Sequence, residues 1–547
     1  MGIPSYFSYI IKNHANIVRA LADTGRIQHL FMDCNSIIYD LFHSLVEKEV
    51  VDEDRLIQQV IDKIADYVKY IRPSKTLYIA FDGVAPLAKM DQQRTRRHKG
   101  LWMPPSSAAA AAAPQKKEWS TCNITPGTPF MIKLSERVGT AFDPVSYGYS
   151  AGIDTVIVSA ATGCGEGEHK LFQHIRREST RWTTTSKKEK EKERWSEDNA
   201  AVYGLDSDLI MLSLFHCQHF KKLYVFRETP EFIKSQIPVS NDPCHFLDIA
   251  HLSSAILQEM RSDKSAGCAI YDYVFMCFLL GNDFLPHFPA LNLRTHGLQV
   301  LLDTYRKVFS STSTRGRGGG GGLIVPTNGS HAIDWKNVQR FLRALAKLEP
   351  ELWSQEYETR AKWSNRKWST ANEKDCEFVL QNVPVIYRAE EMYIAPEHAG
   401  WEARYYRALL PQMTTRSDIC RNYYEGLAWV FQYYTQDCLH WRWRYEYDYP
   451  PLLRDLAEAV PHVDVVYESH PPVSPQTQLA YVIPQELHAD LLDPVMVRYL
   501  ASRPQDLALF KRPAHCAFQW AFCRYFWEAH VHLAPIPVST LEEWEKK

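Results

Sequence analysis

The sequence is 547 residues long, 45% of its residues are hydrophobic, and its formal net charge is −2. A chain of this length can bury a sizeable core and form several domains. The near-neutral charge argues against a protein that coats nucleic acid, because such proteins are strongly basic, and it suits an acidic site and a basic groove that offset each other.

The usual signals of membrane insertion and secretion are missing from the sequence. A transmembrane helix needs a run of about 18 apolar residues, which this chain lacks. The N-terminus has no basic stretch leading into an apolar one, and Tyr6 stands where myristoylation of Gly2 requires Ser or Thr. The 12 cysteines follow no regular spacing, which predicts reduced thiols. We therefore expect a soluble intracellular protein of the nucleus or the cytoplasm.

Short apolar runs alternate with helical patterns over the first 310 residues. This alternation predicts an α/β core with a twisted, mostly parallel sheet that is flanked by helices. The runs expected to form strands are His29–Cys34, Thr76–Phe81, Ile153–Ser159, Ala201–Leu205 and Leu223–Phe226. The later sequence is rich in Trp and Tyr and carries helical patterns, which predicts a mainly helical second region.

Three segments have the composition of insertions or linkers. They are an alanine tract at Ala108–Ala113, a mixed-charge run at Thr183–Glu193 and a Gly-rich stretch that contains RGRGGGGG. A Gly-rich segment behaves as a flexible spacer. We therefore divide the chain into a core of residues 1–310, a linker of residues 311–325 and a second region of residues 326–547.

Acidic residues follow the predicted strands or precede the next helical patterns. Each one alone reads as a turn residue or a helix N-cap. However, five segments carry such acids, and ligands bind beyond the carboxyl ends of strands in open α/β sheets. If the segments converge, the carboxylates repel one another unless cations are bound. The acids are Asp33, Asp82, Glu166, Glu168, Asp206, Asp208 and Asp283.

The spacing of Asp206 and Asp208 places both side chains on one side of the chain if the backbone stays extended. Magnesium prefers oxygen ligands, and manganese accepts the same sites. Two such ions about 4 Å apart can activate water and stabilise the leaving 3′ oxygen of a phosphodiester. The acids therefore predict a site for two Mg²⁺ ions, with Mn²⁺ as an alternative.

A basic helix is expected directly after Asp82. Lys89, Gln93, Arg96 and Arg97 are spaced so that they share one helical face. A terminal phosphate carries about two negative charges near pH 7, and arginine binds such oxygens in a bidentate manner. The face is thus a candidate reader of a free 5′ phosphate, although an ordinary solvated basic face has the same pattern.

Ordered motifs over most of the chain resemble the Xrn family of 5′→3′ exoribonucleases. The N-terminal motifs are MGIPSYF, FMDCNSIIYD, FDGVAPLAKMDQQRTRR, NITPGTPFM, GEGEHK, YGLDSDLIML and LLGNDFLPH, and the second region contributes HWRWRYEYDYPP. The resemblance implies a PIN-like core and a second region that roofs the active site. Unlike the family's large cytoplasmic members, the sequence carries no long C-terminal extension after the second region, and we expect a minimal catalytic core. It implies a monomeric enzyme that degrades 5′-monophosphorylated single-stranded RNA processively to mononucleotides.

The resemblance also assigns site residues. The seven acids match the metal ligands of the family, and Lys89, Gln93, Arg96 and Arg97 match its 5′-phosphate pocket. The family stacks the first base between a histidine and a tryptophan. Tyr39 stands in place of that histidine, and both Trp441 and Trp443 fall in the tryptophan's motif.

Other positions depart from the pattern of the family. Leu87, Asp91 and His98 replace its usual Arg, Asn and aromatic residue, and the first two changes remove positive charge near the phosphate pocket. Two other functions stay open on sequence alone. One is a flap-type DNA endonuclease on the same core, and the other is a protein that binds RNA 5′ ends without cutting them.

Overall fold

The computed structural model describes residues 2–46, 52–100, 119–181, 195–204, 206–229, 242–261, 266–309, 321–327, 330–459, 465, 467, 469–510 and 518–547. The alanine tract, the mixed-charge run and the Gly-rich stretch up to residue 320 lie outside these residues. The expected linker of residues 311–325 therefore lies mostly outside the described chain.

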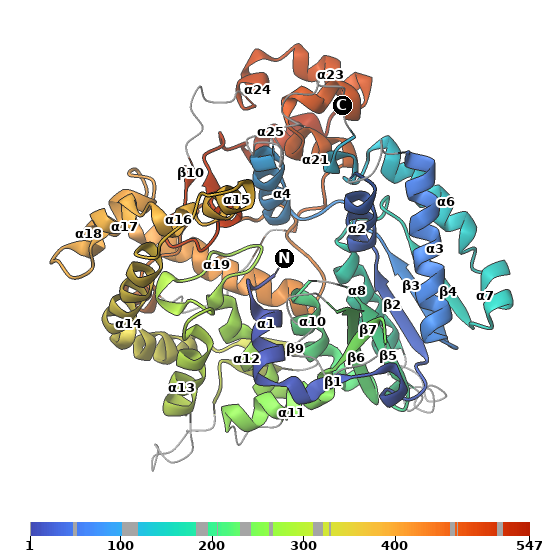
Figure 1. Cartoon of the computed structure of the whole chain (residues 1–547), viewed down its shortest axis with the longest axis horizontal. Helices are drawn as coiled ribbons and strands as arrows, with labels where there is room; N and C mark the ends of the chain where they lie inside the picture. The colour runs from blue at the N-terminus through green and yellow to red at the C-terminus, as the bar shows by residue number, and fades with distance from the viewer. Residues whose placement is uncertain are drawn as a thin grey trace.

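A seven-stranded sheet forms the centre of the N-terminal part of the chain (Figure 1). The strand order is β1-β7-β6-β5-β2-β3-β4, and all neighbours from β6 to β4 pair in parallel. The strands are β1 (Val18–Arg19), β2 (His29–Asp33), β3 (Thr76–Ala80), β4 (Thr155–Ser159), β5 (Asn199–Tyr203), β6 (Lys222–Glu228) and β7 (Cys244–Asp248). The predicted mostly parallel sheet is confirmed. The antiparallel strands β7 and β1 add an edge that the sequence did not predict.

Helices cover both faces of the sheet because successive strand residues alternate between two hydrophobic cores. Leu30 and Met32 of β2 pack on one side, whereas Phe31 between them packs on the other. The first face meets α2 (Asn35–Val46), α3 (Glu53–Ile71) and α6 (Pro129–Ala141). The second face meets α8 (Gly167–Arg181), α10 (Asp208–His216), α11 (Ile249–Met260) and α12 (Ala266–Cys277). The strands are therefore buried on both faces, as expected of a parallel sheet.

The remaining helices of the N-terminal part lie at the borders of this layered core. They are α1 (Tyr6–Asn13), α4 (Leu87–Gly100), α7 (Ser146–Ala151) and α13 (Gly297–Phe309). Among them, α4 carries the predicted basic face. Within the described part of the chain, none of the helices combines the length and the apolar character that a bilayer crossing requires.

The second region is mainly helical, as predicted. Its helices are α14 (Trp335–Ser364), α15 (Glu373–Gln381), α16 (Val383–Ile386), α17 (Ala389–Ile394), α18 (Trp401–Leu409), α19 (Arg416–Thr435), α20 (Leu453–Glu458), α21 (Pro475–Val482), α22 (His488–Leu491), α23 (Pro494–Ala501), α24 (Pro504–Ala508) and α25 (Val538–Trp544). Two short hairpins join β8 (Ile324–Thr327) to β9 (Ser330–Ile333) and β10 (Phe518–Gln519) to β11 (His530–Val531).

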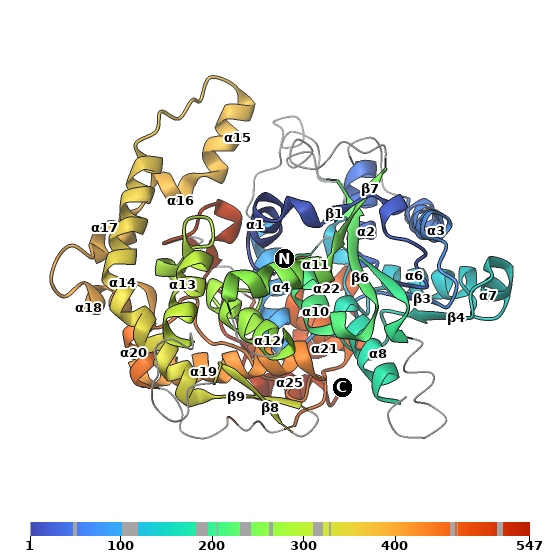
Figure 2. The same cartoon turned by 90° about the horizontal axis from the view of Figure 1, so that it is seen from below.

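The second region wraps around the core rather than standing apart from it. Helices α14 to α18 gather on the side opposite the α3–α6–α7 layer, and α19 returns toward the sheet (Figures 1 and 2). One hydrophobic cluster contains Leu209 of α10, Leu301 of α13 and Trp429 of α19. A second cluster packs Leu87 and Met90 of α4 against the C-terminal helices. Consequently α4 lies between the core and the C-terminal end of the described chain.

Candidate functional site

Seven carboxylates meet where the central strands β5, β2 and β3 end. Because these strands are parallel neighbours, their carboxyl ends lie along the same edge of the sheet. The acids are Asp33 at the end of β2, Asp82 two residues after β3, Glu166 and Glu168 at the start of α8, Asp206 and Asp208 between β5 and α10, and Asp283 in the loop after α12.

Electrostatic effects on the pKa values show how closely the acids approach one another. Burial raises the pKa of Asp33 well above its usual range, and the charges of Asp82 and Asp206 raise it further. Burial and the charge of Asp208 do the same to the pKa of Glu168. The pKa of Asp208 rises to about 7, again through burial and then through the charge of Asp283. All five predicted segments therefore contribute to one cluster.

The condition of an extended backbone at Asp206 and Asp208 is not met. The chain turns there, because Ser207 has right-handed helical torsions and Asp208 begins α10. Asp206 is exposed and Asp208 is buried. Both acids still act electrostatically on Glu168.

Three buried carboxylate oxygens of the cluster have no hydrogen-bond partner among the described residues. They are Oδ1 of Asp33, Oε2 of Glu168 and Oδ1 of Asp208. Buried polar oxygens are normally satisfied, and each exception calls for a ligand or an ion. A hard divalent cation takes carboxylate oxygens as ligands. The residues present therefore fit a divalent metal site.

Lys89 connects the basic helix α4 to the acid cluster. Its Nζ lies 2.5 Å from Oε2 of Glu166 and 2.6 Å from Oδ2 of Asp283. Burial acts to raise the pKa of Asp283, but the lysine charge outweighs it and holds that pKa well below its ordinary value. Lys89 thus faces the acids, whereas the sequence placed it among the phosphate-binding residues.

Asn35 and Gly167 hold Asp82 in place, and the sequence did not single out either residue. The Asn35 side chain donates to Oδ2 of Asp82 at 2.5 Å and accepts from the Asp82 amide at 3.0 Å. The Gly167 amide donates to Oδ1 of Asp82 at 2.7 Å. A Cβ on Gly167 would stand 2.5 Å from Oδ1 of Asp33. Glycine is therefore needed here because the α8 backbone approaches two of the acids closely.

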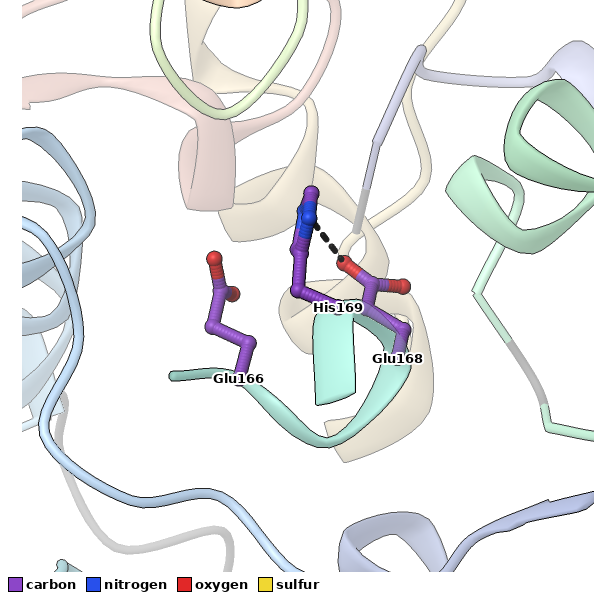
Figure 3. Close-up of side chains that lie close together, drawn as sticks. All are labelled: Glu166, Glu168 and His169. Atoms are coloured by element: carbon purple, nitrogen blue, oxygen red, sulfur yellow. Dashed lines mark ion pairs between the residues drawn. The ribbon is translucent and has the colours of Figure 1, made fainter. Parts of the chain in front are cut away.

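His169 is a further neighbour of the acids that the sequence did not suggest. Ligand atoms of Glu166, Glu168 and His169 all lie within 4.8 Å of one another. The three side chains project to the same side from the turn into α8 (Figure 3). Burial lowers the pKa of His169 well below its ordinary value, and the charge of Arg176 adds to the effect. The imidazole is therefore neutral at neutral pH, as a metal ligand requires.

The other residues of the predicted basic face lie on α4, where they differ in burial. Gln93 and Arg97 are buried, and Oε1 of Gln93 and Nε of Arg97 have no hydrogen-bond partner in the described part of the chain. Arg96 is exposed, and its guanidinium carbon lies 5.9 Å from the centre of the Tyr39 ring. The face thus offers unsatisfied polar groups beside a half-buried aromatic ring.

The three residues that depart from the family's pattern lie on α4, and the structure accommodates each of them. Asp91 forms an ion pair with Arg444 at 3.2 Å and also accepts a hydrogen bond from Tyr481. Leu87 and His98 are buried. The negative charge of Asp91 is therefore offset by Arg444 of the second region.

The two candidate tryptophans differ in their surroundings. Trp443 is buried and stacks on Trp429 with ring centres 5.1 Å apart, so it belongs to the core. Trp441 is partly exposed, and its carbonyl accepts a hydrogen bond of 2.9 Å from the amide of Leu87 at the start of α4. Burial thus favours Trp441 as the residue that can still meet a ligand.

A cavity of about 620 Å³ adjoins the acid cluster. Its lining includes Gly2, Asp283 and Arg96, together with Arg444 and Tyr445 from the second region. Residues from both halves of the chain therefore form its walls. Its volume lies within the usual range for ligand sites.

Comparisons with known proteins match both halves of the chain. The family model described as "XRN 5'-3' exonuclease N-terminus" matches residues 1–229, and the "Xrn1 helical domain" matches residues 265–393 and 390–505. A 5'-3' exoribonuclease 2 of Arabidopsis thaliana is 24% identical over 96% of this chain and 65% of its own length. The 5'-3' exoribonuclease 1 of Saccharomyces cerevisiae is 25% identical over 89% of this chain.

The chain spans only part of the length of these relatives. It covers 65% of the Arabidopsis protein and 39% of the yeast one. A 5'-3' exoribonuclease 2 of Gallus gallus is 23% identical over 96% of this chain and 68% of its own length.

A methyl group at residue 167 should disturb the acid cluster. In Gly167→Ala the new Cβ displaces the Asp33 carboxylate, so we expect Mg²⁺ affinity to fall by about tenfold to a hundredfold. Isothermal titration of the metal-free chain measures this. Gly139→Ala in α6 is the matched control, because nothing lies within 4 Å of a Cβ there. Wild-type affinity in Gly167→Ala would contradict the described geometry.

Mg²⁺ affinity should fall as the pH is lowered. A cation binds the ionised carboxylates, so below the raised pKa of an acid it must displace a proton. For Asp208, with a pKa of about 7, we expect affinity to drop by about tenfold between pH 8 and pH 6, and the raised pKa values of Asp33 and Glu168 act in the same direction. Asp208→Asn should show a shallower pH dependence. An affinity that is unchanged or higher at pH 6 would refute the expectation.

Proposed function

The chain belongs to the XRN 5′-3′ exonuclease family, and from this membership and the site geometry we propose that it is a processive 5′→3′ exoribonuclease. It hydrolyses single-stranded RNA that carries a 5′ monophosphate and releases mononucleotides. The observation that carries the proposal is the set of partnerless buried carboxylate oxygens beside the basic helix α4. The names of the relatives support the direction and the substrate class.

The acid cluster is the proposed site of two divalent cations, Mg²⁺ or Mn²⁺. Asp33, Glu168 and Asp208 present the free oxygens, and Asp82, Glu166, Asp206 and Asp283 complete the set. When bound, two such ions supply the Lewis acidity that activates water and stabilises a leaving 3′ oxygen. The assignment agrees with the family match and with the coordination chemistry of oxygen ligands.

The basic face of α4 is the proposed 5′-phosphate pocket. Gln93 and Arg97 are buried on the helix whose Lys89 pairs with Glu166 and Asp283, which favours a terminal phosphate bound near the acids. Charge-assisted hydrogen bonds to a phosphate dianion are stronger than those to an uncharged 5′ hydroxyl. The pocket thus selects the phosphorylated end, and a bulky cap does not fit a buried donor set.

Aromatic stacking holds the first base in this proposal. Tyr39 lies beside Arg96, and Trp441 is anchored to the start of α4 through its carbonyl. Stacking on a base is tolerant of sequence and contributes about 1–3 kcal/mol per base. The two rings therefore favour an unpaired, unstacked strand over a duplex, without preference for a particular base.

The cavity beside the acids is the proposed path by which the RNA strand reaches them. Gly2, Arg96 and Asp283 line it, so it leads from the N-terminal segment to the metal ligands. Processive advance follows if each newly exposed 5′ phosphate moves into the pocket on α4. The family match to an exonuclease favours this function over flap DNA cleavage, and the acid cluster favours it over binding without cleavage.

The pocket predicts a specific defect in Arg97→Ala. On 5′-monophosphorylated RNA its kcat/KM should fall by about 30-fold or more, because a charge-assisted hydrogen bond to phosphate is lost. On 5′-hydroxyl RNA the variant should match the wild type, whose activity there is already low. Arg137→Ala in α6 is the control, since Arg137 pairs with Asp54 on the surface away from the acids.

Three outcomes of this digest would contradict the proposal. An equal loss of kcat/KM on 5′-monophosphorylated and 5′-hydroxyl RNA would rule out the phosphate pocket. Faster cleavage of flap DNA than of RNA would favour the endonuclease. RNA binding in Mg²⁺ without release of mononucleotides would favour a protein that binds 5′ ends without cutting.

A further inference from the structure

Two neighbouring tyrosines of the second region reach into the acid cluster. Both Tyr433 and Tyr434 lie near the C-terminal end of α19 and are buried. The Tyr433 hydroxyl donates to Oε1 of Glu166 at 2.8 Å. The Tyr434 hydroxyl hydrogen-bonds to the carboxylate of Asp208. The second region therefore contacts acids that come from two different segments of the N-terminal core.

The contacts engage both oxygens of Glu166 but leave one oxygen of Asp208 without a partner among the described residues. Oε2 of Glu166 pairs with Lys89 while Oε1 receives the Tyr433 hydroxyl. Oδ1 of Asp208 has no hydrogen-bond partner among the described residues. A hydrogen bond on one oxygen of a carboxylate restricts its rotation.

Tyr433 also belongs to a stacked column of rings. Its ring lies 3.6 Å from that of His169 and 4.8 Å from that of Trp429. Trp429 in turn stacks on Trp443 at 5.1 Å, and its Nε1 donates to the carbonyl of His440 at 2.9 Å. The column runs without a break from the tryptophan motif to the helix that bears Glu166 and Glu168.

We propose that Tyr433 and Tyr434 are positioning residues that orient Glu166 and Asp208 for divalent metal. The inference rests on the proposed function in taking these acids as metal ligands. Phenylalanine would fill the same space and bury more apolar surface, so packing does not explain the two buried hydroxyls. Partners of metal ligands typically change metal affinity by about tenfold to a hundredfold when they are removed. The second region thus supplies part of the frame of the metal site.

Removing one hydroxyl at a time tests the proposal. Tyr433→Phe and Tyr434→Phe keep the rings and the stacked column but remove the hydroxyl that meets Glu166 or Asp208. We expect each variant to bind Mn²⁺ about tenfold more weakly than the wild type, measured by isothermal titration of the metal-free full chain. With 5′-monophosphorylated RNA, kcat at low Mg²⁺ should fall and recover as Mg²⁺ is raised, while KM for RNA stays constant.

Tyr424→Phe is the matched control. Tyr424 is equally buried on the same helix, but its hydroxyl donates to the carbonyl of Leu456, away from the acids. This variant should bind Mn²⁺ like the wild type. The proposal is overturned if the two positioning variants also bind Mn²⁺ like the wild type, or if Tyr424→Phe loses as much affinity as they do.

The proposed function and the positioning role fail separately in this design. Calorimetry reports metal binding whether or not RNA is cleaved. A wild-type chain that binds Mn²⁺ but degrades no RNA would remove the proposed function and leave the positioning role standing. If the wild-type chain degrades RNA but Tyr433→Phe and Tyr434→Phe bind Mn²⁺ as the wild type does, the positioning role is removed and the proposed function stands.

Discussion

Repulsion between buried carboxylates is the constraint on which the rest of the structure depends. Asp33, Glu168 and Asp208 have raised pKa values because they are buried beside other acids. Such a cluster destabilises the folded chain unless positive charge is placed within it. Lys89 supplies one such charge, and divalent cations are the natural source of more. The repulsion arises from the parallel sheet, because its strands end at a single edge and place their terminal acids there. The same arrangement makes a metal site possible.

The second region is understood most simply as the part that completes this edge. Helix α19 brings tyrosine hydroxyls to Glu166 and Asp208, and the segment after it connects Trp441 to α4. Arg444 in the same segment offsets Asp91 on α4. Within the second region itself, a buried ion pair between Arg360 and Glu391 at 2.6 Å ties α14 to α17. Because the site takes contacts from both halves of the chain, the N-terminal core alone does not complete it. One hydrophobic cluster joins the two halves.

The sequence predicted the elements whose signal is local. Strands such as β2 and β3 are continuous apolar runs that end in an acid, so the sequence alone was enough to place Asp33 and Asp82 on the sheet edge. The sequence did not predict the two-residue strand β1 or the strand β7, which join the sheet by antiparallel pairing of β1 with β7 and of β7 with β6. The backbone between Asp206 and Asp208 is not extended because α10 begins there.

Roles set by tertiary contacts could not be predicted. Trp441 and Trp443 share one motif, and only burial separates them. Tyr433 has the spacing of an ordinary core residue, and nothing in the chain order links it to Glu166. Lys89 has helical spacing with Arg96, yet its amine pairs with the acids. The order of motifs indicated the family, whereas the partners of each side chain required the fold.

A crystal structure of the chain soaked in Mn²⁺, with anomalous scattering, tests the central claim most directly. The account predicts two anomalous peaks at the end of β2, each within about 2.0–2.6 Å of oxygens from acids of at least two segments. Peaks confined to surface carboxylates, with Asp33, Glu168 and Asp208 left without metal, would contradict it.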